Sequence, residues 1–257
     1  MRKPRIWSTV AFLALFVSGL TLFGLLLPAG DHVSAQGSTN LSVRIQSGID
    51  RLELKGIEDP ITAGQASDVV VSAINVDGNV ATDYRGTIRF TSSDIDSRVI
   101  LPANYTLTEA DLGTHTFTSG VRLITKGEQA VTAEDVGTPS LTGSQAAITV
   151  VAGEVVSLAA RADDATLTAN GTDEATITAT LTDQYGNRSN DGTNVTFTLL
   201  SGPGSLENFS AAAARAASPE FRIAAASLPR STVNGEARVV FRTSTVPGTS
   251  MVNVESG

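Results

Sequence analysis

The sequence contains no cysteine and few of the residues on which most protein chemistry depends. Without cysteine there is no disulfide framework, no thiolate metal site and no cysteine nucleophile. The chain has two histidines, His32 and His115, and one tryptophan, Trp7. It has few lysines and a net charge of −8, so no basic patch can be assembled and nucleic acid is excluded as a partner.

Apolar residues make up 41% of the 257 residues, whereas charged residues make up only 17% and aromatic residues 5%. This balance permits a packed core and argues against global disorder. Valine and threonine are frequent, and their β-branched side chains suit the pleated surface of a sheet. The composition therefore favours β-structure.

Residues 1–35 have the layout of a secretory signal peptide. Three basic residues precede an apolar stretch at residues 6–27, and small residues end at Ala35, the expected cleavage site. The apolar stretch is long for a signal peptide and close to the length that spans a bilayer, so an uncleaved N-terminal anchor remains the alternative. In both cases we expect an exported chain, extracellular or at the cell surface, that meets the membrane only through this segment.

After a polar linker at residues 36–48, short runs of alternating apolar residues are separated by Gly, Asn, Asp and Pro. This pattern is typical of successive antiparallel strands. In the first half, it predicts strands at Arg51–Lys55, Ile61–Ala63, Asp68–Asn75, Thr87–Ser92, Gly113–Leu123, Glu128–Glu134 and Gly143–Val151.

The second half repeats this plan. Asn75–Asn79 matches Asp183–Asn187, and each motif follows a β run and precedes a Gly-Thr strand start. About seven short strands in roughly 100 residues fit an immunoglobulin-like sandwich. We therefore predict an all-β chain of two tandem immunoglobulin-like β-sandwiches, at residues 49–152 and 153–257.

The second unit resembles the bacterial immunoglobulin-like domains of the invasin and intimin type. The resemblance is carried by Leu167–Gly171, Ala175–Ala179, Asp183–Asn187, Asn194–Phe197 and Asn234–Ala237. The first unit resembles a related repeat of bacterial surface proteins, through Pro60–Gly64, Gly86–Asp94 and Leu101–Thr106. In the invasin and intimin family such domains act as spacers, and adhesive contacts usually lie in a terminal domain. The resemblance thus implies a role in adhesion.

The second sandwich is predicted to lack its last strand. At the spacing that relates Gly127 to Gly248, the counterpart of Gly143–Val151 falls beyond Gly257. A missing strand leaves backbone unpaired and core uncovered. We expect a truncated reading frame or a piece of a longer array, with completion by a strand from another chain as a third account. An alanine-rich insertion around Ser210–Pro229 predicts a helical turn or an enlarged loop.

No catalytic residue and no cofactor site is predicted. His115 lies in an alternating strand pattern, where a structural role is expected, and no nucleophile-elbow motif accompanies it. Asp94 with Asp96, and Asp163 with Asp164, are the nearest candidates for a glycosidase-like pair of carboxylates. Each pair lies in a turn-like stretch, so we interpret all four as solvated turn residues and predict that the chain is not an enzyme.

No metal site is predicted, although Asp183, Asn187 and Asp191 are weak candidates. Their side-chain oxygens could bind calcium. The same Asp and Asn side chains can instead bond the nearby backbone, and Gly186 can take a positive φ. A turn held by its own side chains is the favoured interpretation.

The two units are joined by Val150–Val155 with almost no linker, which favours a semi-rigid rod. The sequence thus predicts a non-catalytic extracellular structural or adhesion segment, a spacer at or near the bacterial cell surface. Its partner is an unknown protein or a surface polysaccharide. The alternative is an accessory carbohydrate-binding or interaction module of a larger secreted enzyme, with Tyr84, Tyr105 and Tyr185 as its aromatic candidates.

Overall fold

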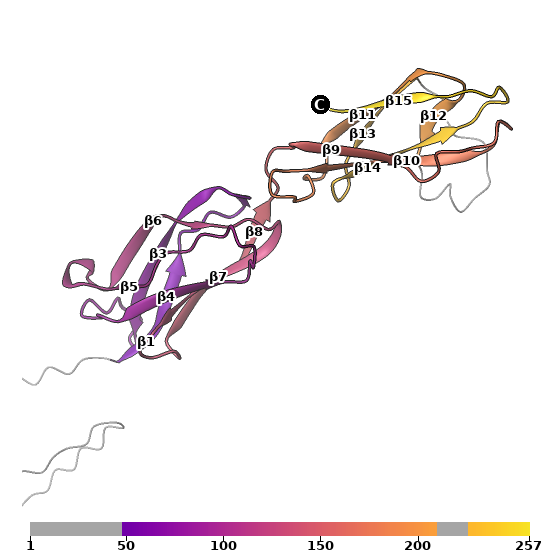
Figure 1. Cartoon of the computed structure of the whole chain (residues 1–257). Helices are drawn as coiled ribbons and strands as arrows, with labels where there is room; N and C mark the ends of the chain where they lie inside the picture. The colour runs from indigo at the N-terminus through magenta and orange to yellow at the C-terminus, as the bar shows by residue number, and fades with distance from the viewer. Residues whose placement is uncertain (1–47, 210–225) are drawn as a thin grey trace, which may run out of the picture. The chain divides into compact units, whose positions relative to one another are not determined.

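The computed structural model describes residues 48–209 and 226–257, which belong to one compact unit, Gln46–Gly257. All of its regular structure is β, apart from one short 3₁₀ turn, η1 at Glu109–Asp111 (Figure 1). Strands β1 to β8 form one pair of sheets, and β9 to β15 form a second pair. The predicted all-β fold with two tandem sandwiches is confirmed.

In the first sandwich, one sheet has the order β1-β3-β6 and the other has the order β2-β8-β7-β4-β5. All pairs are antiparallel except β2 with β8, which run parallel. The bounds are β1 Ile49–Lys55, β2 Ile61–Thr62, β3 Ala66–Asn75, β4 Thr87–Ser92, β5 Tyr105–Thr106, β6 Thr114–Arg122, β7 Gly127–Asp135 and β8 Thr142–Val151. Each strand predicted in this half is present, and only the two-residue β5 was missed.

In the second sandwich, the sheets have the orders β12-β14-β10-β9 and β13-β11-β15, with every pair antiparallel. The bounds are β9 Ser157–Ala162, β10 Glu174–Thr182, β11 Asn194–Ser201, β12 Ser205–Asn208, β13 Ser227–Ser231, β14 Glu236–Arg242 and β15 Met251–Ser256. Residues 210–225 of the alanine-rich insertion lie outside the described residues. The last residues of that insertion belong to β13 and not to a loop.

The alternating sequence pattern places the two cores. In β1, Leu52 and Leu54 are buried while Lys55 is exposed, as the period of two in a half-buried strand requires. In β14, Ala237 and Val239 are buried on the same principle. The described residues form two separate hydrophobic clusters, one inside each sandwich.

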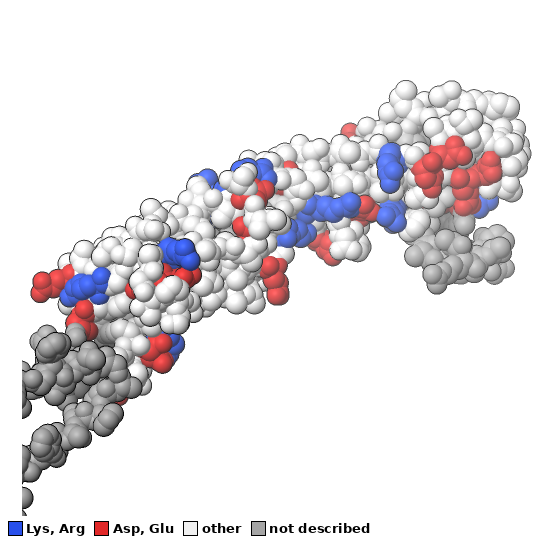
Figure 2. All heavy atoms as spheres, turned by 60° about the horizontal axis from the view of Figure 1, so that its bottom comes forward, with Lys and Arg blue, Asp and Glu red and all other residues white. Residues whose placement is uncertain are grey.

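The charged residues are distributed without a strong segregation of sign. Figure 2 shows Lys and Arg interspersed with Asp and Glu between larger neutral areas on the face in view. Several of these charges pair at the surface, for example Arg89 with Glu134 at 3.0 Å and Arg98 with Asp96 at 2.7 Å. On this face the described residues form no continuous basic patch, in agreement with the net charge of −8.

Candidate functional site

The turn at Asp183–Asn187 follows β10 and is held by the side chain of Asp183. Its Oδ1 accepts hydrogen bonds from the N–H groups of Tyr185 and Asn187, both at 2.9 Å. The N–H of Asp183 donates to the carbonyl of Asn187 at 2.9 Å, which closes the turn. Gly186 has a φ of +88°, a conformation that glycine adopts without strain. These residues therefore form a tight turn stabilised by its own side chains.

The second carboxylate oxygen of Asp183 binds the connector between the sandwiches. Oδ2 accepts from the N–H of Gly153 at 3.0 Å and from Nδ2 of Asn187 at 2.9 Å. Next to it, Asn190 accepts from the N–H of Ala152 at 3.1 Å and donates to the carbonyl of Ala152 at 3.0 Å. Both connector residues are thus fixed to the second sandwich.

Asn187 also binds the loop that precedes β7 in the first sandwich. Its Nδ2 donates to the carbonyl of Ile124 at 2.8 Å, and its Oδ1 accepts from the N–H of Lys126 at 2.9 Å. The ammonium group of Lys126 donates to the carbonyls of Arg188 at 3.1 Å and Ser189 at 2.8 Å. One asparagine and one lysine thereby connect the two sandwiches through hydrogen bonds that satisfy backbone groups on both sides.

Tyr185, at the tip of this turn, adds an apolar contact. It packs against the hydrophobic cluster of the first sandwich. Its ring lies directly against Gly64, where a Cβ atom would overlap the ring and where φ is +82°. The guanidinium carbon of Arg98 lies 5.0 Å from the ring centroid, and Arg98 donates to the Tyr185 carbonyl at 3.1 Å. We name the group formed by Asp183, Tyr185, Asn187 and Lys126 the junction turn.

The carboxylate of Asp183 is ionised in this setting. Only 3% of the residue is exposed, and burial alone would raise its pKa. The hydrogen bonds from the side chain of Asn187 and from the N–H groups of Gly153, Asn187 and Tyr185 outweigh burial, so the pKa of Asp183 is lowered below its ordinary value. The negative charge is therefore part of the folded junction at neutral pH.

The weak calcium candidates use their oxygens as acceptors for N–H groups. Oδ1 of Asp191 accepts from the N–H of Asn234 at 2.7 Å, whereas the oxygens of Asp183 and Asn187 hold the junction turn. Within residues 48–209 and 226–257, no group of three or more His, Asp or Glu side chains is arranged to hold a metal ion. A calcium ion at Asp183 and Asn187 would have to displace the hydrogen bonds from Gly153 and Lys126.

The three tyrosines considered for sugar stacking all contact other protein groups. Tyr84 is buried and donates to the carboxylate of Asp135. Tyr105 stacks on His115 with ring centroids 4.0 Å apart, and its hydroxyl donates to Asp111. Tyr185 is held in the junction turn. Each of the three therefore has a protein partner at its ring or at its hydroxyl group.

His115 and the paired carboxylates are also engaged structurally. Nδ1 of His115 lies 2.6 Å from Oδ1 of Asp111, and its ring packs edge-on against Phe117 at 4.6 Å. Asp94 is buried, and its oxygens accept from the N–H groups of Ile124 at 2.7 Å and Thr125 at 2.9 Å. These groups stabilise loops and the β6 surface.

The other three carboxylates of these pairs bind locally. Asp96 binds Arg98, whose hydrogen bonds lower the pKa of Asp96 to about 2. Asp163 accepts from the N–H groups of Asp164 and Thr176 at 2.9 and 2.8 Å. Asp164 accepts from the N–H of Thr166 at 2.8 Å. The structure therefore uses both pairs as turn caps.

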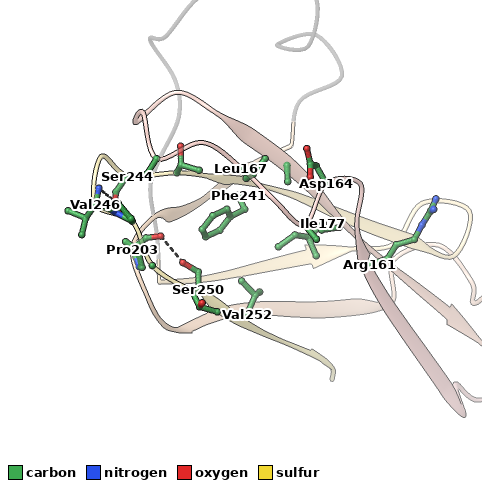
Figure 3. A pocket seen from close by; sticks show the side chains of 18 of the residues that line it. Arg161, Asp164, Leu167, Ile177, Pro203, Phe241, Ser244, Val246, Ser250 and Val252 are labelled. Carbon is green, nitrogen blue, oxygen red and sulfur yellow. Dashed lines mark hydrogen bonds between the residues drawn. The ribbon is translucent and has the colours of Figure 1, made fainter.

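Sequence reasoning did not find a pocket of about 790 Å³ in the second sandwich (Figure 3). Its walls come from β9, β10, β14 and β15, together with the loops at Leu167 and at residues 243–250. In Figure 3, Phe241 and Ile177 lie in the middle of the labelled side chains, and Val252 lies near them. Arg161 and Asp164 provide charged groups on the β9 side. The pocket is a slot between the two sheets with both polar and apolar groups in its walls, and we call it the β15 slot.

In the first sandwich, β8 occupies the corresponding place. It pairs with β7 and passes so close to β1 that a Cβ atom on Gly143 would overlap the backbone of Leu52. It buries Ile148 to 0% and Val150 to 1% exposure. In the described part of the second sandwich, β15 pairs with β11 alone and forms an open sheet edge.

Burial of the strands confirms this difference. Val131 and Ala133 of β7 are fully buried, whereas Val252 and Val254, their counterparts in β15, are only partly buried. The sequence spacing predicted a missing strand at this edge. The slot itself could have been inferred from Val252 and Val254, which alternate as a core-facing pair without a following apolar strand to cover them.

The predicted signal peptide or anchor, including Ala35, and most of the polar linker lie outside the described residues. Where the chain is described, it contains no helix with the length and apolar character needed to cross a membrane.

Comparison with known proteins gives two kinds of match. A family model, the glycoside hydrolase family 2 C-terminal domain 5, matches residues 158–257, which is less than half of the chain. A search of curated proteins found no match.

Similar solved structures include bacterial adhesin domains. FdeC, an adhesin of Escherichia coli, has a TM-score of 0.42 and 19% identity, over 81% of this chain and 60% of that one. Invasin, a bacterial integrin-binding protein, has a TM-score of 0.36 and 22% identity, over 80% of this chain and 36% of that one. The D00-D0 domain of intimin has a TM-score of 0.36 and 18% identity, over 80% of this chain and 92% of that one.

These likenesses agree with the resemblance to invasin and intimin that the sequence motifs indicated. At such scores and identities they assign no activity or ligand to this chain. The chain also spans less than two thirds of the FdeC and invasin structures.

Proposed function

We propose that this chain is a non-catalytic extracellular segment, a semi-rigid spacer of tandem immunoglobulin-like domains on or near a bacterial cell surface. The signal-like N-terminal sequence supports export. The contacts of His115, of the paired carboxylates and of the three tyrosines support a structural role, because each of these side chains interacts with another group of the protein. The metal candidates Asp183, Asn187 and Asp191 have a structural use as hydrogen-bond acceptors.

The junction turn is the single observation that carries this proposal. The connector residues Ala152 and Gly153 are held by Asn190 and Asp183, and Asn187 with Lys126 binds both sandwiches. A flexible linker has no such partners and leaves adjoining domains free to reorient. Hydrogen bonds on both sides of the connector restrict the reorientation of the two sandwiches. A spacer requires this restriction.

Small-angle X-ray scattering of the purified chain tests the spacer role. We expect an elongated particle with a narrow distribution of distances between the sandwiches. The variant Asn187→Ala, which removes the hydrogen bonds to Ile124 and Lys126, should broaden that distribution. Asn79→Ala, in the matching turn of the first sandwich, is the control and should leave it unchanged. A compact particle, or an equally broad distribution in all three proteins, contradicts the proposal.

A second candidate is an accessory module of a larger secreted enzyme. The match of residues 158–257 to a C-terminal domain of glycoside hydrolase family 2 favours it. Such a module would hold a neighbouring catalytic domain or bind polysaccharide. Titration with a glycan panel, followed by tyrosine fluorescence, tests the polysaccharide-binding form of this candidate. A saturable change supports polysaccharide binding, and no response across the panel contradicts it.

A further inference from the structure

We propose that β6 of the first sandwich pairs with β6 of a second copy of this chain, in an antiparallel arrangement centred on Thr116. The interface is Thr114–Thr118, which we call the β6 window. The inference goes beyond the spacer role and does not depend on it. It rests on the direction of the backbone groups in the window, on its side chains, and on a partly exposed aromatic cluster on its inner face.

The β6 window is an open edge within the first sandwich. In its sheet β6 pairs with β3 alone, and it lies at the margin of the sandwich (Figure 1). Among the described residues, the one backbone bridge on the other side of β6 joins Arg122 to Ile100. That bridge lies at the end of the strand, beyond a bulge at Ser119, where φ is +51°. The window itself is left without a neighbouring strand on this side.

The backbone groups of the window point to the open side at alternate residues. The N–H of Ala73 in β3 donates to the carbonyl of Gly113 at 2.9 Å, and the register places Val71 opposite His115. Because bonded and non-bonded pairs alternate in an antiparallel ladder, His115 bonds to β3 and Thr116 directs its N–H and C=O away from β3. Thr116 can therefore exchange two hydrogen bonds with Thr116 of a second copy.

The side chains of the window match their own copies in this register. When Thr116 lies opposite itself, Thr114 lies opposite Thr118 on the same outer face, and cross-strand threonine pairs stabilise a sheet. Thr116 and Thr118 are exposed, so this face is accessible. On the inner face, His115 lies opposite Phe117 of the second copy, which makes an aromatic pair. The segment is thus self-complementary on both faces.

The inner face of the window carries a partly exposed aromatic cluster. Tyr105 stacks on His115 with ring centroids 4.0 Å apart. Phe117 packs edge-on against Phe90 at 5.0 Å and against Tyr105 at 5.5 Å. None of these four side chains is fully buried. A second copy would extend the cluster across the interface and remove apolar surface from water.

The window lacks the features that protect other edge strands of the chain. Native edges are often protected by charged side chains or by proline. At the opposite edge of the same sheet, β1 contains Asp50 and Arg51, and the edge strand β13 contains Pro229. The β6 window contains no Lys, Arg, Asp, Glu or Pro. A second copy therefore meets no like charge within the window.

The contact uses the same surface on both copies, so it is isologous and closes as a dimer. Two three-stranded sheets then join into one sheet of the order β1-β3-β6-β6-β3-β1. The two-fold axis at Thr116 reverses the direction of every strand, and the two chains therefore run in opposite directions.

Sedimentation velocity over a concentration series tests the association of the exported chain. We expect a change from monomer to dimer and no larger species. Thr116→Lys should raise the dissociation constant about fivefold at low salt, because two ammonium groups then lie opposite each other. Thr132→Lys is the matched control and should have no effect, since both edges of β7 are paired at Thr132. A monomer at every concentration, or equal effects of the two variants, overturns the proposal.

A mixture of oppositely charged variants tests the register. Thr116→Lys and Thr116→Glu each weaken their own dimer, whereas their mixture places an ammonium group opposite a carboxylate. We expect the mixture to associate at least about fivefold more tightly than either variant alone, and to lose this gain at high salt. The mixture of Thr132→Lys with Thr132→Glu should show no gain. If the Thr116 mixture behaves as the sum of its parts, the register centred on Thr116 is wrong.

A single cysteine tests the two-fold axis. Because the chain has no cysteine, Thr116→Cys carries one thiol. In a bonded antiparallel pair the opposed Cα atoms lie about 5.5 Å apart, a separation that a disulfide spans. Mild oxidation should therefore give a covalent dimer at least about tenfold faster than with Thr132→Cys, because pairing raises the effective concentration of the two thiols. Equal rates for the two variants overturn the pairing at β6.

Discussion

The two sandwiches are built on the same plan but differ in how one edge is covered. In the first, β8 pairs with β7 and fully buries Ile148 and Val150. In the second, β15 is the edge strand among the described residues, and its core-facing valines remain partly exposed. The comparison shows how β8 shields this edge of the first core, since it pairs with β7 and passes close to β1.

A second comparison concerns the repeated turn. Oδ1 of Asn75 accepts from the N–H groups of Asp77 at 3.1 Å and Asn79 at 2.9 Å, the same pattern that Asp183 makes with Tyr185 and Asn187. Asp183 has a second oxygen, and this oxygen binds the connector residue Gly153. The two turns thus share their local hydrogen bonds. Where the first has the amide of Asn75, the second has the carboxylate of Asp183, and its additional acceptor oxygen binds the connector.

The largest expected effect comes from a substitution in β8, the strand that covers the edge of the first sandwich. Ile148→Ala removes a fully buried side chain of β8 and should lower the free energy of unfolding of the first sandwich by about 3 kcal/mol. Val254→Ala, on the open edge, should cost the second sandwich less than about 1 kcal/mol, because that side chain is already partly hydrated. Urea titration with NMR signals from each sandwich measures both. Equal losses would show that the two edges are equally covered.

The next effect concerns the repeated turn. Asp183→Ala leaves the N–H groups of Gly153 and Tyr185 without their acceptor in a buried place and should cost about 2 kcal/mol. Asn75→Ala removes the matching acceptor at a more exposed turn, where water replaces it, and should cost about 1 kcal/mol or less. Differential scanning calorimetry of both variants gives the ranking, and a reversed order would contradict the role assigned to Asp183.

A third prediction separates backbone strain from packing. Gly64 and Gly78 both have positive φ, +82° and +81°, but only Gly64 lies against the ring of Tyr185. Gly78→Ala should cost about 1 kcal/mol for the left-handed backbone alone. Gly64→Ala should cost more and should also shift the NMR signals of Tyr185 and the Lys126 amide. If those signals stay in place, the ring does not depend on Gly64.

The sequence predicted the fold better than the contacts within it. Strand positions such as Asp68–Asn75 and Thr87–Ser92 follow from local alternation, which a single sequence displays. The two-residue β5 and the strand that begins at Ser227 were missed, because β5 is too short for a period and Pro229 together with the preceding alanines indicated a loop. Pro229 is tolerated there because β13 is the edge strand of its sheet.

The junction turn was identified only as a turn. Its local hydrogen bonds follow from the Asp and Asn residue types, but the partners of Asn187 do not. Ile124 and Lys126 are distant in sequence, and only the fold brings their backbone groups to Asn187. Of the β15 slot, the sequence offered only the alternating pair Val252 and Val254, because the other side chains come from three further strands and from loops that only the fold brings together.

The smallest expected effect is a dependence of the stability of the second sandwich on pH. The pKa of Asp183 is lowered in the folded chain, because hydrogen bonds from Asn187 and from the Gly153 N–H outweigh the burial that would raise it. A lowered pKa means that the stabilisation is complete above the ordinary value near 3.8 and is lost as the pH falls through the folded value. Protonation weakens the acceptor without deleting it, so the loss is smaller than that of Asp183→Ala.

Melting curves between pH 7 and pH 2 measure this dependence. The original chain should lose stability below about pH 4, and Asp183→Asn should show a shallower decline over the same range because its amide does not titrate. Asp94, whose pKa is also lowered in the first sandwich, titrates in both proteins and provides the common background. Since Asn75 already occupies the matching position of the first turn, the variant makes the two turns chemically alike. If Asp183→Asn left the pH dependence of the melting temperature of the second sandwich unchanged, the carboxylate of Asp183 would stabilise its turn no more than the amide of Asn75 stabilises the first turn.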